Sequence, residues 1–329
     1  MGAVSADVPS GRPGRAARRR ARRRPAPLPQ REGLDPVRWV VPPEAPATAG
    51  ALAALADRFP ALADPAATPL RERFDRGDVV DADGHAWRAE DPVGPGHELW
   101  FHRELRDEHV PEVDLEILHR DEHLLVLDKP HDMATMPRGA HVLASALVRL
   151  RRSTGIGTLV PLHRLDRRTA GVLAFGIRPE ERSAYQQLFA RGVARKEYDA
   201  CVRPEPGARI PTTAGEQAVL RDRLGKRHGQ LTAQVLAGEP NAETSLEVVD
   251  VAADGTTTLH LRPRTGRTHQ LRLQLSARGA PILGEDLYPR PVEPPSMPLQ
   301  LLARSLAFTD PVTGQERIFR SGRTLAAAR

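Results

Sequence analysis

Short apolar runs joined by turns constrain the fold more than any other feature of this chain. Residues 115–118 and 124–127 are apolar runs separated by polar residues 120–122, which is typical of a strand hairpin. Residues 246–251 and 256–261 form a second such pair around Asp254-Gly255. An antiparallel component of the sheet is therefore predicted.

Helical segments alternate with these strands. Apolar side chains recur at helical spacing over residues 142–152, and residues 179–191 begin with a proline and end before Gly192. A strand is expected between them, over residues 171–177. Strands joined by both hairpins and helices indicate an α+β fold with a mixed, mostly antiparallel sheet over residues 113–323.

A smaller α/β domain is expected over residues 45–110. Helical composition covers residues 51–58 and 70–76, and residues 77–80 resemble a strand.

In front of this small domain, residues 1–35 combine Arg, Pro, Gly and Ala, which predicts a disordered tail. Residues 1–30 hold eight arginines and one acid, which gives this segment a net charge of +7. The whole chain has a net charge of +6, so the remaining residues together carry about −1. The tail is either a solvated arm or a non-specific phosphate contact, and any RNA-binding surface on the folded body must be a local patch.

Other classes of protein are disfavoured by what the sequence lacks. Cys201 is the only cysteine, which excludes an intramolecular disulfide framework and a thiolate metal cluster within one chain. No run approaches the roughly 20 apolar residues that span a bilayer. We expect a cytoplasmic protein without a membrane segment and without a bound metal.

Two polar segments carry candidate chemistry. Asp166 stands among three arginines and precedes an apolar strand, an environment that favours an ionised carboxylate, as an anionic nucleophile requires. An ordinary ion pair is the alternative. In residues 265–272, Thr268 can cap a short helix and Arg272 can meet a carboxylate bidentately; a basic surface helix is the alternative here.

A third segment contains Lys196-Glu197-Tyr198 at the start of a strand. The chain has only three tyrosines, so a tyrosine between charges is informative, and its ring can stack on a base. A half-buried strand tyrosine is the competing interpretation.

Five segments occur in a fixed order between residues 115 and 320: Asp121-Glu122-His123 with Asp128-Lys129-Pro130, His163 to Asp166 with Thr169-Ala170-Gly171, Lys196 to Tyr198, Thr265 to Arg272, and Gly279 to Glu285 with Tyr288. Together they resemble the bacterial family of RNA pseudouridine synthases, which isomerise uridines in ribosomal and transfer RNA. The resemblance implies the α+β fold of that family and an isomerase that needs no cofactor.

The resemblance also implies roles for single residues. Asp166 would be the nucleophile, Tyr198 would pack on the flipped uracil, Arg272 would pair with Asp166, and Arg164 would help fill the space that the base leaves. Further substrate contacts are expected from His163, Arg267, His269 and Gln270. These roles agree with the chemistry, because a base that is detached, turned and rejoined must first leave the stack, and a carboxylate can act at the ribose without a metal.

The sequence departs from the family pattern at three positions. Ala170 replaces a serine, Gln274 stands where histidine is common, and Leu302 stands where histidine precedes Ala303. Residues 45–110 resemble, more weakly, a small RNA-binding domain shared with a ribosomal protein, although Asp75, Asp78, Asp81 and Asp83 dilute its basic face. Ribosomal RNA is therefore the first expected substrate and transfer RNA the second, with the enzyme acting as a monomer.

Two other functions compete. A non-catalytic RNA-binding protein could retain the synthase fold, although intact Asp166, Tyr198 and Arg272 argue against it. A glycoside hydrolase with Glu285 and Asp286 as paired carboxylates is disfavoured, because adjacent residues tend to point apart and aromatic residues make up only 4% of the chain.

Overall fold

The computed structural model describes residues 25–44, 50–64, 67–105, 107–139, 141–227, 229–292 and 297–328. Most of the Arg-rich tail lies outside the described residues. The chain divides into two compact units, Met1–Arg106 and Asp107–Arg329, called here the N-terminal and C-terminal units. None of the helices in the described ranges is long and apolar enough to cross a membrane.

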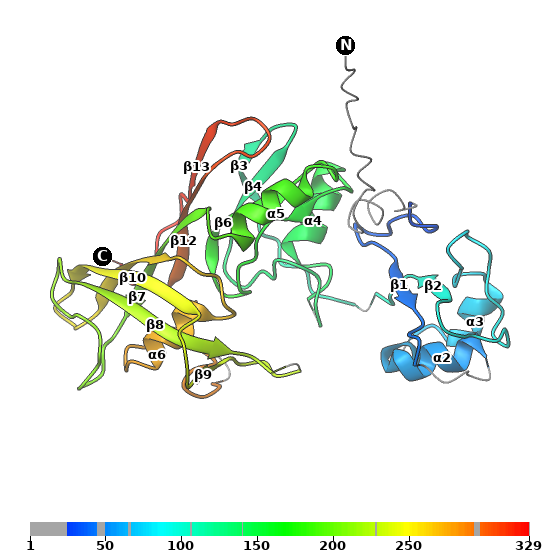
Figure 1. Cartoon of the computed structure of the whole chain (residues 1–329), viewed down its shortest axis with the longest axis horizontal. Helices are drawn as coiled ribbons and strands as arrows, with labels where there is room; N and C mark the ends of the chain where they lie inside the picture. The colour runs from blue at the N-terminus through cyan, green and yellow to red at the C-terminus, as the bar shows by residue number, and fades with distance from the viewer. Residues whose placement is uncertain are drawn as a thin grey trace, which may run out of the picture. The chain divides into compact units, whose positions relative to one another are not determined.

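The N-terminal unit packs short helices against a two-stranded sheet (Figure 1). Its strands are β1 (Val37–Val40) and β2 (Glu98–Phe101), and its helices are α2 (Ala51–Arg58), η1 (Pro60–Ala63) and α3 (Leu70–Asp75). The helix predicted over residues 51–58 is confirmed as α2. The strand predicted over residues 77–80 is wrong, because Gly77 turns the chain at φ 73° and Val80 forms only single-residue bridges.

Residues that the sequence assigned to the tail pack on this unit. Leu34, placed in the expected tail, is buried at 5% exposure. The carbonyl oxygen of Pro29 lies 2.8 Å from Nε2 of His102. Residues 25–35 therefore belong to the N-terminal unit.

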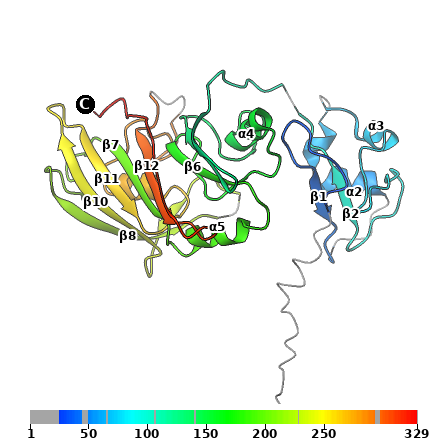
Figure 2. The same cartoon turned by 90° about the horizontal axis from the view of Figure 1, so that it is seen from above.

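The C-terminal unit is built on one sheet, whose strands run side by side in Figure 2. Along the main path, the described strands follow the order β3-β4-β6-β12-β7-β11-β10-β8-β9. Their bounds are β3 Glu116–Arg120, β4 Leu124–Lys129, β6 Ala170–Gly176, β7 Arg195–Val202, β8 Gln217–Gly225, β9 Gln234–Leu236, β10 Ala242–Val251, β11 Thr257–Pro263 and β12 Leu301–Thr309. Two further strands, β5 (Val160–Pro161) and β13 (Glu316–Arg320), pair with β6 and β12.

Among the described strand pairs, only β6 and β12 run parallel. The predicted mixed, mostly antiparallel α+β sheet is therefore confirmed, as are its two hairpins, β3–β4 and β10–β11.

Helices cover both faces of the β4–β6 half of the sheet. Leu125 and Leu127 of β4 pack with α4 (Ala146–Thr154), whereas Leu124 and Val126 pack with α5 (Arg182–Ala190) on the other face. Successive strand residues point to opposite faces, so both sets must be apolar. This explains why β4 and β6 are buried along their whole lengths.

Helix α4 begins four residues later than its apolar periodicity predicted. The carboxylate of Glu108 accepts hydrogen bonds from the backbone N–H groups of Val142, Leu143 and Ala144, at 2.7–3.0 Å. These N–H groups are therefore held in a turn in front of the helix. A side chain 34 residues away decides where the helix starts.

The third helix, α6 (Gln270–Ser276), packs on the other half of the sheet. Its Leu271 and Leu275 join a core cluster with β7, β8, β10 and β11. Tyr198 on β7 borders both this cluster and the α4 cluster. The junction of the two clusters is where the candidate site lies.

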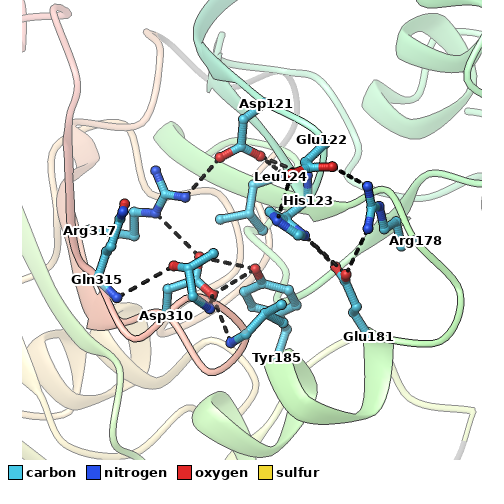
Figure 3. A network of polar contacts seen from close by, with 12 residues as sticks. Asp121, Glu122, His123, Leu124, Arg178, Glu181, Tyr185, Asp310, Gln315 and Arg317 are labelled. Atoms are coloured by element: carbon cyan, nitrogen blue, oxygen red, sulfur yellow. Dashed lines mark hydrogen bonds and ion pairs between the residues drawn. The ribbon is translucent and has the colours of Figure 1, made fainter.

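A polar network at Tyr185 and Asp310 fixes helix α5 to the sheet on which it packs (Figure 3). The hydroxyl of Tyr185 donates to the carboxylate of Asp310, with oxygen distances of 2.9 and 3.0 Å. Arg317 bonds the same carboxylate at 3.3 Å and also Asp121 in the β3–β4 turn at 2.9 Å. The network holds the helix whose last turn carries Phe189 into the candidate site.

Candidate active site

A cavity of about 360 Å³ lies between the loop before β6, strand β7 and the start of α6. This volume falls within the range of pockets that enclose small ligands, roughly 300–1,000 Å³. The cavity brings together every site residue expected from the sequence, from three separate segments: His163, Arg164, Asp166, Tyr198, Arg267, His269, Gln270 and Arg272.

Asp166 is held by its backbone neighbours. The side chain of Leu165 is buried in the α4 cluster, and both its N–H and its C=O bond to Oγ1 of Thr135, at 3.1 and 2.8 Å. On the other side, the carbonyl of Arg167 accepts from Nζ of Lys129 at 3.1 Å. Both flanking peptides are fixed, so the Asp166 side chain is directed into the cavity while remaining 21% exposed.

Lys129 is a fully buried lysine beside this loop. Its Nζ also donates to the carbonyls of Pro130 and Met133, at 2.9 and 2.8 Å. Burial lowers the pKa of Lys129 to about 7, against the opposing influence of Asp166 and Asp132. The Asp-Lys-Pro segment thus acts on the site by fixing the backbone.

The arginines that follow Asp166 do not pair with it. Arg167 forms an ion pair with Asp132 at 3.1 Å, and buried Arg168 lies 3.3 Å from Asp286. Within the described ranges, only His269 lies at ion-pair distance from the Asp166 carboxylate, at 3.8 Å. The alternative of an ordinary Asp–Arg ion pair is therefore wrong, because folding turns these guanidinium groups toward other acids.

Arg272 also has a different partner from the one expected. Its guanidinium forms a bidentate ion pair with Glu285, including Nε–Oε2 at 2.8 Å, and a further pair with Asp286 at 2.5 Å. The predicted ion pair between Arg272 and Asp166 is therefore wrong. Burial lowers the pKa of Arg272, but Glu285, Asp166 and Asp286 together raise it, so Arg272 acts on Asp166 as a nearby fixed positive charge.

Tyr198 stands on β7 between β11 and β12, opposite Leu261 and Ala303. Burial and then the Asp166 charge raise the pKa of its phenol, so the ring is neutral. Two residues earlier, Lys196 lines the same cavity, with its Nζ 3.5 Å from the carbonyl of Thr265. Burial lowers the pKa of Lys196.

His163 forms part of the wall of the cavity. Its ring stacks on Phe189 at a centroid distance of 4.8 Å, and its Nε2 accepts the N–H of Ala174 at 3.1 Å. Burial and the nearby Lys196 lower its pKa to about 3. The ring is therefore neutral and held by the protein, whereas Arg164, on the same loop, is exposed.

Gln270 holds the loop at the start of α6. Its amide oxygen accepts from Thr265 Oγ1 and the N–H of Arg267, and its amide nitrogen donates to the carbonyl of Glu243 and to Thr244 Oγ1, all at 2.8–3.1 Å. These bonds occupy the amide, so the expected substrate contact by Gln270 is not supported.

The capping role expected for Thr268 is wrong. The N-cap position of α6 belongs to His269, and it lacks a side-chain capping bond.

Some residues around the cavity carried no predicted role. Lys196 and Tyr288 belong to the segments noted in the sequence, but spacing alone did not show that Lys196 lines the cavity or that Tyr288 bonds His269. Phe189 had no local signal, because it reaches the cavity only through the packing of α5.

Comparisons with known proteins agree with this architecture. Residues 123–277 match the family model described as RNA pseudouridylate synthase. The dual-specificity RNA pseudouridine synthase RluA of Escherichia coli strain K12 is 31% identical over 211 residues, which cover 63% of this chain and 92% of that protein. This chain belongs to the RNA pseudouridine synthase family.

Other members of the RNA pseudouridine synthase family extend the comparison. An uncharacterised RNA pseudouridine synthase of Synechocystis is 30% identical over 222 residues, covering 66% of this chain and 73% of that protein. Human RNA Pseudouridylate Synthase Domain Containing 1 shares the fold, with a TM-score of 0.50 and 22% identity over 62% of this chain and 82% of that one. As a member of this family, the chain is an isomerase that modifies RNA.

The three departures from the synthase pattern do not line the cavity. Gln274 is fully buried and bonds Thr244, Asp222 and the carbonyl of Leu220. Ala170 and Leu302 pack together in a small apolar cluster. These positions belong to the support of the sheet and of α6.

Proposed function

We propose that this RNA pseudouridine synthase isomerises specific uridines of ribosomal RNA, with transfer RNA as the second candidate, and that Asp166 is its nucleophile. The observation that carries the proposal is the Asp166 carboxylate itself. It is directed into the cavity and lacks an arginine or lysine partner among the described residues. A relative that this chain covers over 92% of its length is named a dual-specificity RNA pseudouridine synthase, which supports an RNA substrate.

The chemistry assigns one role to each side chain. The Asp166 carboxylate attacks C1′ of the ribose, and the N-glycosidic electron pair leaves with the uracil. The detached uracil turns and its C5 bonds C1′, which releases the carboxylate; the proton lost from C5 is balanced by one gained at N1. No step requires a metal or a cofactor.

Neutral Tyr198 offers a ring face for the flipped base, while the positive charge of Arg272 favours the developing anion of the uracil. Arg164 and Arg267 are exposed among the lining residues, where they can meet the RNA backbone. His163 forms the wall against which the nucleotide rests. All these groups come from one chain, so we propose that a monomer acts.

The decisive experiment compares the wild-type enzyme with Asp166→Asn, a nearly isosteric variant. Pseudouridine is mapped by carbodiimide primer extension in ribosomal and transfer RNA from a deletion strain that carries either gene. We expect one or more sites to return with the wild type and none with Asp166→Asn, while the purified variant still binds RNA. Turnover by Asp166→Asn would refute the nucleophile assignment, and RNA binding without turnover by the wild type on any RNA would favour a non-catalytic binder.

The N-terminal unit is proposed to assist RNA binding. A separate cavity of about 290 Å³ in this unit is lined by Arg31, Arg73, Arg76 and Arg103, together with three carboxylates. Arg103 is exposed there and is a candidate for phosphate contact. We expect Arg103→Ala in the full chain to raise the Kd for RNA several-fold without changing kcat; an unchanged Kd would leave the unit a packing appendage.

A further inference from the structure

The hydroxyl of Tyr288 has a defined direction. Tyr288 is buried at 7% exposure, and its oxygen accepts the backbone N–H of Ala233 at 2.8 Å. Its own proton therefore needs an acceptor, since an unsatisfied buried donor is costly. Among the described residues, the group in position to accept is Nδ1 of His269, at 2.8 Å. Accepting this proton leaves neutral His269 with its hydrogen on Nε2.

That Nε2–H group faces Asp166. The His269 side chain is 9% exposed, and its Nε2 lies 3.8 Å from Oδ1 of Asp166. A distance of this size shortens to a hydrogen bond with a small movement when substrate closes the site. Burial lowers the pKa of His269, so a neutral ring, which can donate without protonating the carboxylate, is the form present.

The backbone of His269 is held in an unusual conformation. Its φ of 53° lies in the left-handed region, which costs a residue with a side chain roughly 1 kcal/mol. Asparagine, aspartate and histidine are the residues with side chains that are most often found in this conformation. The backbone therefore admits a histidine here without requiring one, and the ring that reaches from Tyr288 to Asp166 is what distinguishes histidine from the other two.

We infer that Tyr288 and His269 form a hydrogen-bond chain that orients the Asp166 carboxylate, fixing Oδ1 so that the other oxygen attacks C1′. Both are positioning residues, because they act through Asp166. The inference rests on the proposed role of Asp166 as nucleophile. It adds a function for Tyr288, which does not line the cavity.

A matched pair of substitutions at His269 tests the chain. His269→Gln retains an amide N–H close to the place of Nε2, whereas His269→Asn suits the left-handed backbone but ends near the place of Nδ1. We expect His269→Asn to lower kcat about 10- to 100-fold with little change in the Kd for RNA, because the carboxylate of Asp166 is no longer held in one orientation. His269→Gln should retain kcat within about fivefold of the wild type. Equal kcat values for the two variants would overturn the inference.

Tyr288→Phe tests the hydroxyl alone, because the ring and its contact with Arg272 remain. Nitrogen NMR of labelled histidine should show His269 as the Nε2–H tautomer in the wild type and a mixture in Tyr288→Phe. The charged groups facing His269 are Asp166, Glu285, Arg272 and Lys226, and none of them changes in this variant. In a plot of kcat against pH, the acid limb of Tyr288→Phe should lie at higher pH than that of the wild type, because Nδ1 of His269 is more easily protonated without the hydroxyl. An unchanged tautomer and acid limb would contradict the chain.

These outcomes separate the inference from the proposed function. If Asp166→Asn retains turnover, the nucleophile assignment fails whatever the His269 variants show. If Asp166→Asn is inactive while His269→Asn and Tyr288→Phe match the wild type, Asp166 keeps its role and only the hydrogen-bond chain is rejected.

Discussion

Arg272 and Glu285 form a bidentate ion pair in which each side chain is only 3% exposed. The pair joins α6 to the segment that follows it and supports one wall of the active site. Its partners are 13 residues apart, and neither is free to turn to water. Removing the charge of Glu285 therefore leaves the buried guanidinium of Arg272 with Asp286 as its remaining ion-pair partner.

Glu285→Gln is expected to lower the free energy of unfolding by about 2 kcal/mol, because the buried guanidinium of Arg272 loses its bidentate carboxylate and keeps only Asp286 as an acidic bonding partner. Glu239→Gln changes an exposed carboxylate and serves as the control, with an expected change below about 0.5 kcal/mol. Urea unfolding of both variants measures the difference. Equal stability of the two would show that Asp286 alone satisfies Arg272.

Gly171 follows the active-site loop at the parallel contact between β6 and β12. Its φ is 110°, and an added Cβ would lie 2.2 Å from the backbone oxygen of Ala303. Gly171→Ala is expected to cost about 3 kcal/mol or to prevent folding, because backbone must move. Gly255→Ala, at φ 82° with no atom within 4 Å of its Cβ, should cost only about 1 kcal/mol. Urea unfolding and soluble yield check the contrast, which similar losses for both variants would disprove.

His163 should make the enzyme less stable in acid. Its folded pKa of about 3 lies below its ordinary value of 6.5, so the unfolded chain binds a proton first as the pH falls. The stability linked to His163 is fully present above pH 6.5 and is lost as the pH falls toward 3. His163→Gln lacks this titrating group, so its free energy of unfolding should fall less steeply than that of the wild type between about pH 6 and 4. The difference between the two slopes should reach up to about 1.4 kcal/mol per pH unit.

The measurement is urea unfolding at several pH values. His85→Gln, which changes a histidine side chain 80% exposed to solvent, is the control and should follow the wild type. Parallel curves for the wild type and His163→Gln would show that His163 is not buried in its neutral form.

The Arg-rich start of the sequence should affect RNA affinity but not catalysis. Deleting residues 1–24 removes eight arginines and one acid. For each phosphate that these arginines neutralise, the deletion should reduce the slope of log Kd against log salt by about 0.7–0.9. A chain with a Gly/Ser segment of equal length is the control for length alone. Loss of turnover at saturating RNA would show that these residues belong to the catalytic machinery.

The sequence predicted the local elements well because their signals are local. Short apolar runs separated by polar turns specify the β3–β4 and β10–β11 hairpins without reference to the rest of the chain. The start of α4 was missed because Glu108, far away in sequence, binds the backbone in front of it. The β6–β12 pairing joins segments more than 130 residues apart, and no local pattern encodes it.

The site could be predicted as a set of residues but not as a set of contacts. All eight expected residues line one cavity. The partners of Arg272 were missed because three acids lie near one guanidinium, and only the path of residues 284–286 brings Glu285 and Asp286, rather than Asp166, into contact with it. The contacts of Gln270 were equally hard to predict, since an amide at a cavity wall can face either the ligand or the protein.

The carboxylate of Asp128, next to Lys129, is fully buried and is satisfied by Ser321, Gly322 and Arg323. Residue 321 is added to the growing chain 193 residues after Asp128. During synthesis on the ribosome, the strand end that anchors the Asp166 loop must therefore wait without these partners until almost the whole C-terminal unit has been made. A chain cut short before Ser321 would keep every residue that lines the candidate active site but lack the partners of Asp128 that hold this strand end.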